Sequence, residues 1–215
     1  MTDWQPTKLR DFFFHYDFAN PNHTAGIDLL QRHAAEIMND NAEWVKAFRG
    51  TLEGSDSSYL EKATDIIAEF EGFRASPYMC PAGIWTVGYG TTYYPNGELV
   101  SPTDRSISKP EGMTLLSSHI DHAIVPFLEK IPTWGIMNGC QKAAIISFAY
   151  NLGAHFYGDS NFNTITKALS SQANWTDVPN ALMLYVNPGS PFEAGLRRRR
   201  QAEGELWSGR GKFSQ

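Results

Sequence analysis

Residues 71–91 read EGFRASPYMCPAGIWTVGYGT, a segment that sets a glutamate, a cysteine and a threonine among several glycines and prolines. Two changes of pattern meet in it. Upstream, apolar residues recur at three- and four-residue intervals, the period of a helix with one buried face: Leu60, Ala63, Ile66, Ile67 and Phe70. Ser58 and Glu61 form an S-x-x-E pair typical of a helix start, and the helix is expected to end near Gly72.

Downstream of the same segment, the sequence predicts a small sheet. Trp85–Tyr89 is rich in β-branched and aromatic residues, and Pro95-Asn96-Gly97 is typical of a turn that joins two short strands. We therefore expect a helix end that meets a sheet.

Glu71 is the candidate for acid–base chemistry. It lies four residues after Ile67, along the apolar stripe of the expected helix and at its end. Partial desolvation at such a position favours the neutral carboxyl group, which is the form that a general acid needs near neutral pH. The alternative is an exposed ion pair with Arg74, and for a glutamate taken alone this is the more common arrangement.

Composition restricts the class of protein. The 215 residues are enough for one domain with a sizeable core and a small appendage, and the formal net charge of −5 argues against a general nucleic-acid binder. No apolar run reaches roughly 18 residues, and Met1–Pro6 lacks the pattern of a signal peptide. We expect synthesis in the cytoplasm, a reducing compartment in which Cys80 and Cys140 stay free thiols.

Residues 1–55 predict a helical accessory module ahead of a main domain over 56–215. Ile27, Leu30, Ala34 and Ile37 have helical spacing, and the stretch 50–58 is rich in glycine and serine, as linkers are. A unit of about fifty residues is near the lower size limit for independent folding, so we expect it to dock on the main domain.

The central segment also carries a recognisable signature. Residues 71–90 match E-G-x-R-x-x-x-Y-x-x-x-x-G-x-W-T-x-G-Y-G, which resembles the catalytic motif of phage-type lysozymes, the endolysins and muramidases of glycoside hydrolase family 24. Ile107–Leu116, with Ser108 as candidate N-cap and Pro110 in the first turn, is similar to the helix start that follows the sheet in that family. Ala143–Gly153 is similar to its buried central helix, and Gly195–Glu203 to its C-terminal G-L-x-x-R-R-x-x-E helix.

The resemblance covers about residues 58–209 and implies a fold and an activity. The fold is α+β and lysozyme-like, with a small antiparallel sheet lobe, a larger helical lobe and, here, an added N-terminal helical segment. The activity is hydrolysis of the β-1,4 bond between N-acetylmuramic acid and N-acetylglucosamine in bacterial peptidoglycan, which lyses the host cell. Acid catalysis and substrate strain supply this chemistry, so no metal or other cofactor is expected.

The same resemblance implies the partners and the place of action. Bacterial peptidoglycan is the expected partner, with no nucleic acid and no stable membrane insertion, and the protein is expected to be a monomer. Made in the host cytoplasm without a signal peptide, it would act on the cell wall after release, through a separate membrane-permeabilising partner or from within a virion.

By motif position, Glu71 is the general acid and Thr86 the hydroxyl that holds the attacking water. Cys80 is a departure, because many family members carry an aspartate there, nine residues after the glutamate, as the second catalytic carboxylate. Three roles stay open for Cys80: a partly ionised base or nucleophile, a residue that only shapes the site, or a substitution that impairs the enzyme. We expect activity because the surrounding segment is intact. Thr91 replaces a common histidine, and no role is assigned to it.

The resemblance further implies four substrate-binding residues, which are Tyr89, Asn151, Arg198 and Arg199. Asn151 either offers its amide to the cleft or supports the helix end at Gly153, and the run of arginines leaves open which one faces Glu71. His119 and His122 lack the H-E-x-x-H pattern of a zinc site and are expected to be surface or interface residues.

Other functions are compatible with the same fold. The chain could be a non-catalytic cell-wall-binding protein, a lytic transglycosylase that uses one glutamate and forms an anhydro sugar, or a structural phage protein with a vestigial lysozyme domain.

Overall fold

The computed structural model describes residues 59–214, which lie within one compact unit, Ser57–Gln215. The expected accessory module and the Ser58 cap of the first helix lie outside the described residues. Among the helices of the described part, none has the length and apolar character needed to cross a membrane.

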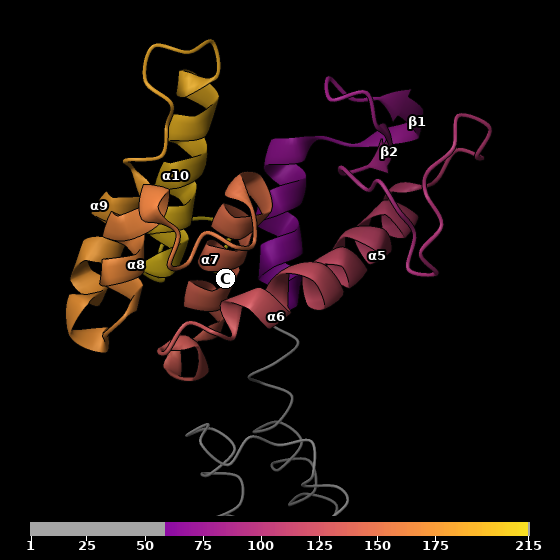
Figure 1. Cartoon of the computed structure of the whole chain (residues 1–215). Helices are drawn as coiled ribbons and strands as arrows, with labels where there is room; N and C mark the ends of the chain where they lie inside the picture. Colours follow the sequence, from indigo (N-terminus) through magenta and orange to yellow (C-terminus); the bar gives the residue numbers. More distant parts are fainter. Residues whose placement is uncertain (1–58, 215) are drawn as a thin grey trace, which may run out of the picture. The chain divides into compact units, whose positions relative to one another are not determined.

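The described residues form two lobes, as the resemblance implied (Figure 1). The small lobe holds a two-stranded antiparallel sheet, and the large lobe consists of helices. The chain is helical over 59–71 and then runs through these elements: β1 (Arg74–Met79), β2 (Trp85–Gly88), α5 (Lys109–His119), η1 (Ile120–Ile124), α6 (Val125–Leu128), η2 (Trp134–Ile136), α7 (Gly139–Leu152), η3 (Ser160–Phe162), α8 (Asn163–Leu169), η4 (Gln172–Asp177), α9 (Val178–Leu182) and α10 (Glu193–Trp207).

The hairpin of the small lobe is short and irregular. β1 and β2 pair in register at Tyr78 with Thr86, and at Arg74 with Gly88, with a bulge between the two pairs. The turn at Pro95-Asn96-Gly97 forms as predicted, but a single bridge between Tyr93 and Leu99 closes it instead of two strands. The prediction was therefore right for the turn and wrong for the strands.

One nearly continuous helix, built from α5, η1 and α6, links the lobes. Its start is confirmed: the Ser108 side chain caps α5 and forms a capping box with Glu111, while Pro110 lies in the first turn. α5 contacts β2, and η1 contacts α7. In a regular helix, a proline ring clashes with the carbonyl oxygen four residues back. Pro126 lies in the first turn of α6, two residues after the π-helical turn η1 ends, and this wider turn relieves the clash.

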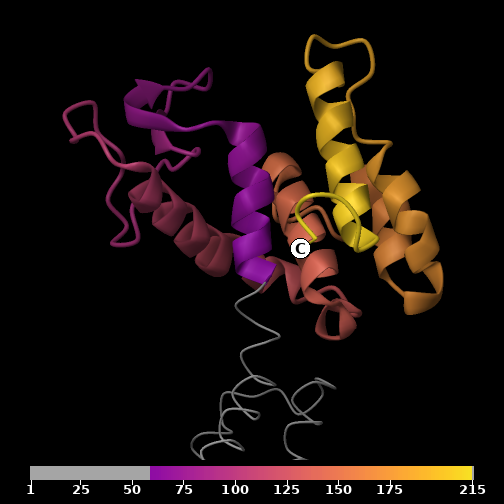
Figure 2. The same ribbon diagram turned by 180° about the vertical axis from the view of Figure 1, so that it is seen from behind.

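The main core lies in the large lobe around α7. Residues 142–149 of this helix are all buried, as expected for the central helix, and Phe148 makes edge-to-face contacts with Phe156 at a ring distance of 5.0 Å. The helix over 59–71 contributes Ala63, Ile66 and Ile67 to the same core. Seen from behind, it lies between the linking helix and α7 (Figure 2).

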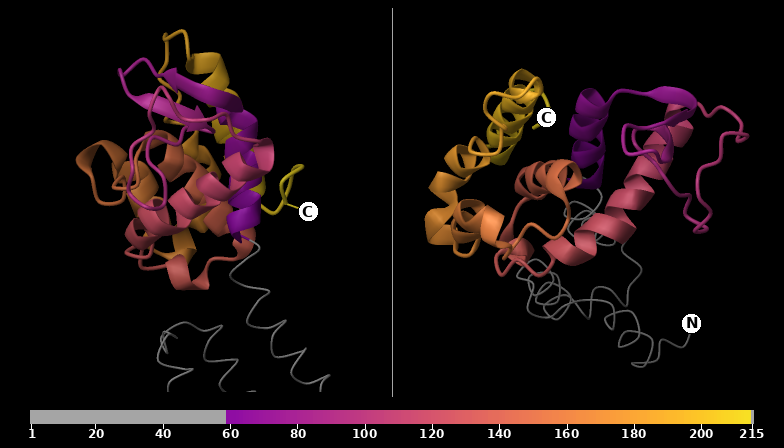
Figure 3. Two further views of the ribbon diagram at one scale, coloured as in Figure 1. Left: turned by 90° about the vertical axis from the view of Figure 1, so that its right-hand side faces the viewer. Right: turned by 45° about the horizontal axis from the view of Figure 1, so that its top comes forward.

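A second, smaller core supports the sheet and consists of Val87, Val100 and Ile107. On the other side of the helix over 59–71, α10 packs against α7 (Figure 3). The last residues of the 59–71 helix therefore lie between the two lobes, with α10 on one side and the sheet on the other.

Candidate active site

Glu71 is the last residue of the helix over 59–71, and it pairs with a distant arginine. Its side chain is 29% exposed, and Nη1 of Arg199 donates to its Oε1 at 2.6 Å. The alternative, an exposed pair with Arg74, does not form, because the Arg74 guanidinium lies over the Tyr78 ring at 4.3 Å. As a whole residue Glu71 is exposed, despite its place on the apolar stripe, and its charge is balanced by Arg199 of α10.

Arg199 is buried, at 4% exposure, and its guanidinium is held on three sides. Nη2 donates to the backbone carbonyl of Ser147 at 3.1 Å. Nε donates to the Ser147 hydroxyl at 3.4 Å and to Oε1 of Glu203 at 3.3 Å. Arg198, the other candidate, is exposed. The structure therefore assigns Arg199 as the arginine that faces Glu71.

Glu203 is a fully buried carboxylate at the centre of this network. Its Oε1 accepts hydrogen bonds from the Ser147 hydroxyl at 2.7 Å and from Nη2 of Arg200 at 2.9 Å. Nε of Arg200 lies 2.8 Å from Oε2, an ion pair without hydrogen-bond alignment. Burial raises the pKa of Glu203, against the opposing effect of Arg200 and Arg199.

Arg200 is fully buried too, and it binds Asn151. Desolvation lowers the pKa of Arg200 to about 10, although the charge of Glu203 acts in the other direction. Nη2 of Arg200 donates to the Asn151 amide oxygen at 3.0 Å. The helix end itself is capped by Gly153, whose N–H donates to the carbonyl of Ala149. From the described part of the chain, no hydrogen bond reaches the Asn151 amide nitrogen, so this group is available to a ligand.

Tyr150 joins the acid to the small lobe. Its hydroxyl donates to the backbone carbonyl of Tyr89 at 2.8 Å. Burial, followed by the charge of Glu71, raises the pKa of Tyr150 well above its usual range. Gly90 has φ of +111°, and a Cβ there would lie 2.7 Å from the Tyr150 hydroxyl. This contact gives a steric reason for the glycine in Gly88-Tyr89-Gly90.

Tyr89 does not have the position expected of a substrate-binding side chain. It is 7% exposed and belongs to the main core, where its ring packs on Phe73 at 5.3 Å. The backbone carbonyl of Tyr89 is already bonded to Tyr150. We therefore correct this prediction and interpret Tyr89 as a core residue.

Cys80 and Thr86 flank the turn of the hairpin. Both cysteines are free thiols, as expected, and Cys80 is half-buried. The pKa of Cys80 is lowered, first by the backbone N–H of Ile84 and then by that of Ala82, while desolvation opposes the shift. Thr86 is 3% exposed, and its hydroxyl donates to the Ile84 carbonyl at 3.0 Å.

The predicted residues thus form two groups. Glu71, Arg199 and Asn151 belong to one network in the large lobe, which Arg200 completes, and Cys80 and Thr86 belong to the hairpin. Tyr78, which pairs with Thr86 across the hairpin, acts electrostatically on Tyr150, as Glu71 also does. Within residues 59–214, no hydrogen bond or ion pair joins Glu71 to Cys80 or Thr86.

The two histidines have different settings. His119 is half-buried, with Nδ1 at 3.1 Å from the Tyr93 hydroxyl, its ring edge-to-face against Tyr150, and a pKa lowered by burial. His122 is exposed, as predicted. Over the described residues, no group of three or more His, Cys, Asp or Glu side chains is arranged to hold a metal ion.

Sequence reasoning gave no role to four residues of the site, namely Ser147, Tyr150, Arg200 and Glu203. A signal for them existed. Ser147, Tyr150 and Asn151 are spaced to share one face of a helix, and Arg199 and Arg200 lie four and three residues before Glu203, within one turn of it. Polar residues at one-turn spacing on the otherwise apolar central helix, together with opposite charges at one-turn spacing near the C-terminus, indicate a buried polar contact between the two helices.

Comparison with known proteins supports the same family. The profile of the family described as phage lysozyme matches residues 68–203. A SAR-endolysin of Haemophilus phage HP1 is 28% identical over 200 residues, which are 84% of this chain and 100% of that protein. A SAR-endolysin of Escherichia phage P1 is 26% identical, over 66% of this chain and 77% of its own length. The structure of a mutant P22 lysozyme matches the fold with a TM-score of 0.56 at 22% identity, over 68% of this chain and 94% of that chain.

These relatives overturn one expectation. Two of them bear the name SAR-endolysin, in which SAR denotes an N-terminal signal-anchor-release segment for secretion. The prediction that the protein is made in the host cytoplasm without a signal peptide conflicts with this finding and is wrong. It rested on the pattern of a cleavable signal peptide, which does not describe a signal anchor.

The family acts on peptidoglycan, so the chain is a cell-wall lytic enzyme in its broad class. The match over residues 68–203 includes the helix end with Glu71, the hairpin and the arginines of α10. With a profile that spans more than half of its length and a fold shared with solved lysozymes, the chain belongs to the phage lysozyme family.

Proposed function

We propose that the protein is a muramidase that hydrolyses the β-1,4 bond between N-acetylmuramic acid and N-acetylglucosamine in peptidoglycan, and that this activity lyses the host cell. The observation that carries the proposal is Glu71, a carboxylate at a helix end between the lobes, with Oε1 fixed by Arg199 at 2.6 Å. From the described residues, no hydrogen bond reaches Oε2, which leaves this oxygen to hold the proton for the leaving glycosidic oxygen.

Four further residues have roles in this proposal, two from the hairpin and two from the helices α7 and α10. Thr86 uses its proton in the bond to Ile84 and keeps acceptor lone pairs, with which it would hold the attacking water. Cys80 would act as the base or nucleophile in its thiolate form, because its lowered pKa increases the thiolate fraction near neutral pH. Asn151, through its free amide nitrogen, would bind the substrate, and exposed Arg198 would contact anionic wall polymers.

The test is clearing of a bacterial cell-wall suspension by the wild type and by Glu71→Gln. Removal of a general acid costs about 100-fold to 10,000-fold in rate, so the variant should show almost no clearing. Glu69→Gln is the matched control, since Glu69 lies on the same helix and makes an exposed pair with Lys212 at 2.7 Å. It should clear like the wild type. Full activity of Glu71→Gln would refute the acid assignment.

The products separate the remaining alternatives. Hydrolysis adds one water to each cleaved bond, whereas a lytic transglycosylase forms an anhydro sugar of lower mass. Mass spectrometry of the released fragments should therefore show reducing ends and no anhydro product. Wall binding without any released fragment would favour a non-catalytic cell-wall-binding protein.

A further inference from the structure

The buried network behind Glu71 contains more than an ion pair. Within the described part of the chain, Arg199 is the only side chain that donates hydrogen bonds to both Glu71 and Glu203. These two carboxylates come from different elements, the helix over 59–71 and α10, and Ser147 adds a third element, α7. Three segments distant in sequence thus converge on one guanidinium.

The contacts leave this guanidinium little freedom. Nε faces Glu203 and the Ser147 hydroxyl, Nη2 faces the Ser147 carbonyl, and Nη1 faces Glu71. A planar guanidinium has a fixed fork of donors, so occupying two of its edges determines the direction of the third. The Ser147 hydroxyl is fixed in turn, because it donates to Oε1 of Glu203 at 2.7 Å. The place of Nη1, and hence of Oε1 of Glu71, depends on Glu203.

Charge gives a second link between the two carboxylates. Glu71 and Glu203 balance Arg199 and Arg200, so the buried cluster is neutral when all four groups are ionised. The charged groups that face Glu203 are Arg199 and Arg200 from α10, while α7 offers the uncharged Ser147 and α9 packs on the same helix through Pro179. Glu71 faces Arg199 and, from α7, the phenol of Tyr150. Removal of the negative charge of Glu203 would leave an excess positive charge next to Glu71.

We propose that Glu203, together with Ser147, is a positioning residue that sets the direction of Arg199 and the charge environment of the acid Glu71. It touches no substrate and acts through the arginine. The proposal rests on the proposed function of Glu71, but its key measurement does not require turnover. A purely structural role is the competing explanation, because a buried carboxylate also compensates the buried Arg200.

The experiment follows the titration of Glu71 by carbon NMR of its carboxyl group, assigned by comparison with Glu71→Gln. In Glu203→Gln, which keeps the size and removes the charge, the carboxyl titration of Glu71 should move to lower pH than in the wild type, since the environment becomes more positive. The alkaline limb of wall clearing should move to lower pH by the same amount. Glu205 lies on the same helix, and within residues 59–214 its side chain accepts a hydrogen bond from Gln201 alone. Glu205→Gln should therefore leave both midpoints unchanged.

A second variant keeps the proposal testable if Glu203→Gln does not fold. Ser147→Ala removes the hydroxyl bridge between Arg199 and Glu203 without changing charge. The kcat for hydrolysis of soluble peptidoglycan fragments should therefore fall roughly threefold to tenfold with KM unchanged, as expected for lost orientation. An unmoved Glu71 midpoint in Glu203→Gln, with only a lower melting temperature, would show a structural role. An unmoved kcat in Ser147→Ala would count against positioning. A wild type that titrates as expected but clears no wall would refute the proposed function and leave this inference standing.

Discussion

Cys80 is the residue at which the hairpin departs from the usual chemistry of glycoside hydrolysis. Glycoside hydrolysis normally uses two carboxylates, and the hairpin presents a thiol where the second one is expected. The backbone N–H groups of Ile84 and Ala82 lower the pKa of this thiol, as amide groups do around a bound anion. The hairpin backbone thus favours the thiolate form of Cys80.

The lowered pKa of Cys80 leads to a prediction for two variants. Cys80→Ser should clear walls at least about tenfold more slowly than the wild type, because a serine hydroxyl stays neutral and cannot replace a thiolate. Cys80→Asp should keep most of the activity and shift the acid limb of the pH profile downward, since a carboxyl group ionises at lower pH than a thiol. Clearing rates across the pH range check both. An unchanged rate and pH optimum for Cys80→Ser would rule out thiol chemistry.

For single residues, the sequence predicted which side chains form the site better than it predicted their contacts. The motif singled out Glu71, but its partner Arg199 is 128 residues away, and local spacing favoured Arg74 instead. The register of the arginine run is fixed only when α10 packs against α7, a tertiary contact. Tyr89 was misjudged for a similar reason, because a motif does not reveal which side chain of the turn after β2 packs into the core.

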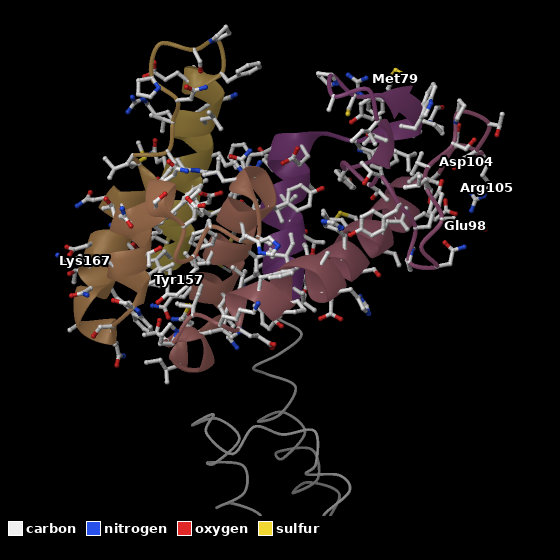
Figure 4. The ribbon with its side chains drawn as sticks, viewed as in Figure 1. Met79, Glu98, Asp104, Arg105, Tyr157 and Lys167 are labelled. Carbon is white, nitrogen blue, oxygen red and sulfur yellow. The ribbon has the colours of Figure 1, made fainter. Side chains whose placement is uncertain are left out.

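Among the elements, α5 shows how local chemistry defines a helix. Its capping box unites Ser108 and Glu111, and Glu111 also binds Arg105 at 2.5 Å. Arg105 belongs to the long loop of the small lobe, which Figure 4 shows with Asp104 and Glu98. The start of the linking helix is therefore fixed both by its own cap and by the preceding loop.

The pH dependence of this cap can be tested. The bond from Arg105, and next the bonds from the backbone N–H and hydroxyl of Ser108, lower the pKa of Glu111 to about 2. A carboxyl group whose pKa is lower in the folded state stabilises the fold above its unfolded pKa of about 4.3, and this contribution is lost as the pH falls toward 2. Glu111→Gln should therefore lower the melting temperature at pH 7 and have no effect near pH 2.

Thermal unfolding followed by circular dichroism at several pH values measures this difference. Glu98→Gln, in the exposed turn of the same lobe, provides the control and should melt like the wild type at each pH. A melting difference for Glu111→Gln that stays constant between pH 7 and pH 2 would contradict the assigned linkage.

The elements that the sequence predicted well are those with local signals. α5 has a cap and a proline, and α7 and α10 have long motifs, so their existence follows from nearby residues. The short turns η2, η3 and η4 escaped because a few residues of 3-10 helix have no period of their own. The strands expected around Pro95-Asn96-Gly97 reduce to one bridge, since a turn signal does not determine how far pairing extends beyond it.

On the scale of the whole molecule, the two lobes are unequal. The large lobe has a continuous core around Phe148, whereas the sheet rests on three buried aliphatic residues, Val87, Val100 and Ile107. Glu71 belongs to the large lobe, and Cys80 and Thr86 belong to the small one. The proposed chemistry therefore depends on the stability of the weaker lobe as well as on the buried network of the stronger one.

Ile107→Ala tests this inequality. Ile107 joins the loop to the sheet, since its N–H donates to the Ala75 carbonyl at 2.8 Å and its side chain is 8% exposed in the small core. Truncation of a buried isoleucine costs about 2–5 kcal/mol. Because the small core holds so few residues, we expect the loss to appear as local opening: amides of β1 and β2 should exchange hydrogen faster, while amides of α7 keep their rates.

Phe148→Ala is the counterpart in the large lobe, where the removed ring leaves a cavity in the core that both the 59–71 helix and α7 share. Here the loss of about 3–5 kcal/mol should lower protection in both lobes, because the sheet has no support once the helices open. Hydrogen exchange read by mass spectrometry or NMR distinguishes the two patterns. If Ile107→Ala accelerates exchange in α7 as much as in the hairpin, the lobes unfold as one unit, and the hairpin with Cys80 and Thr86 cannot open independently of Glu71.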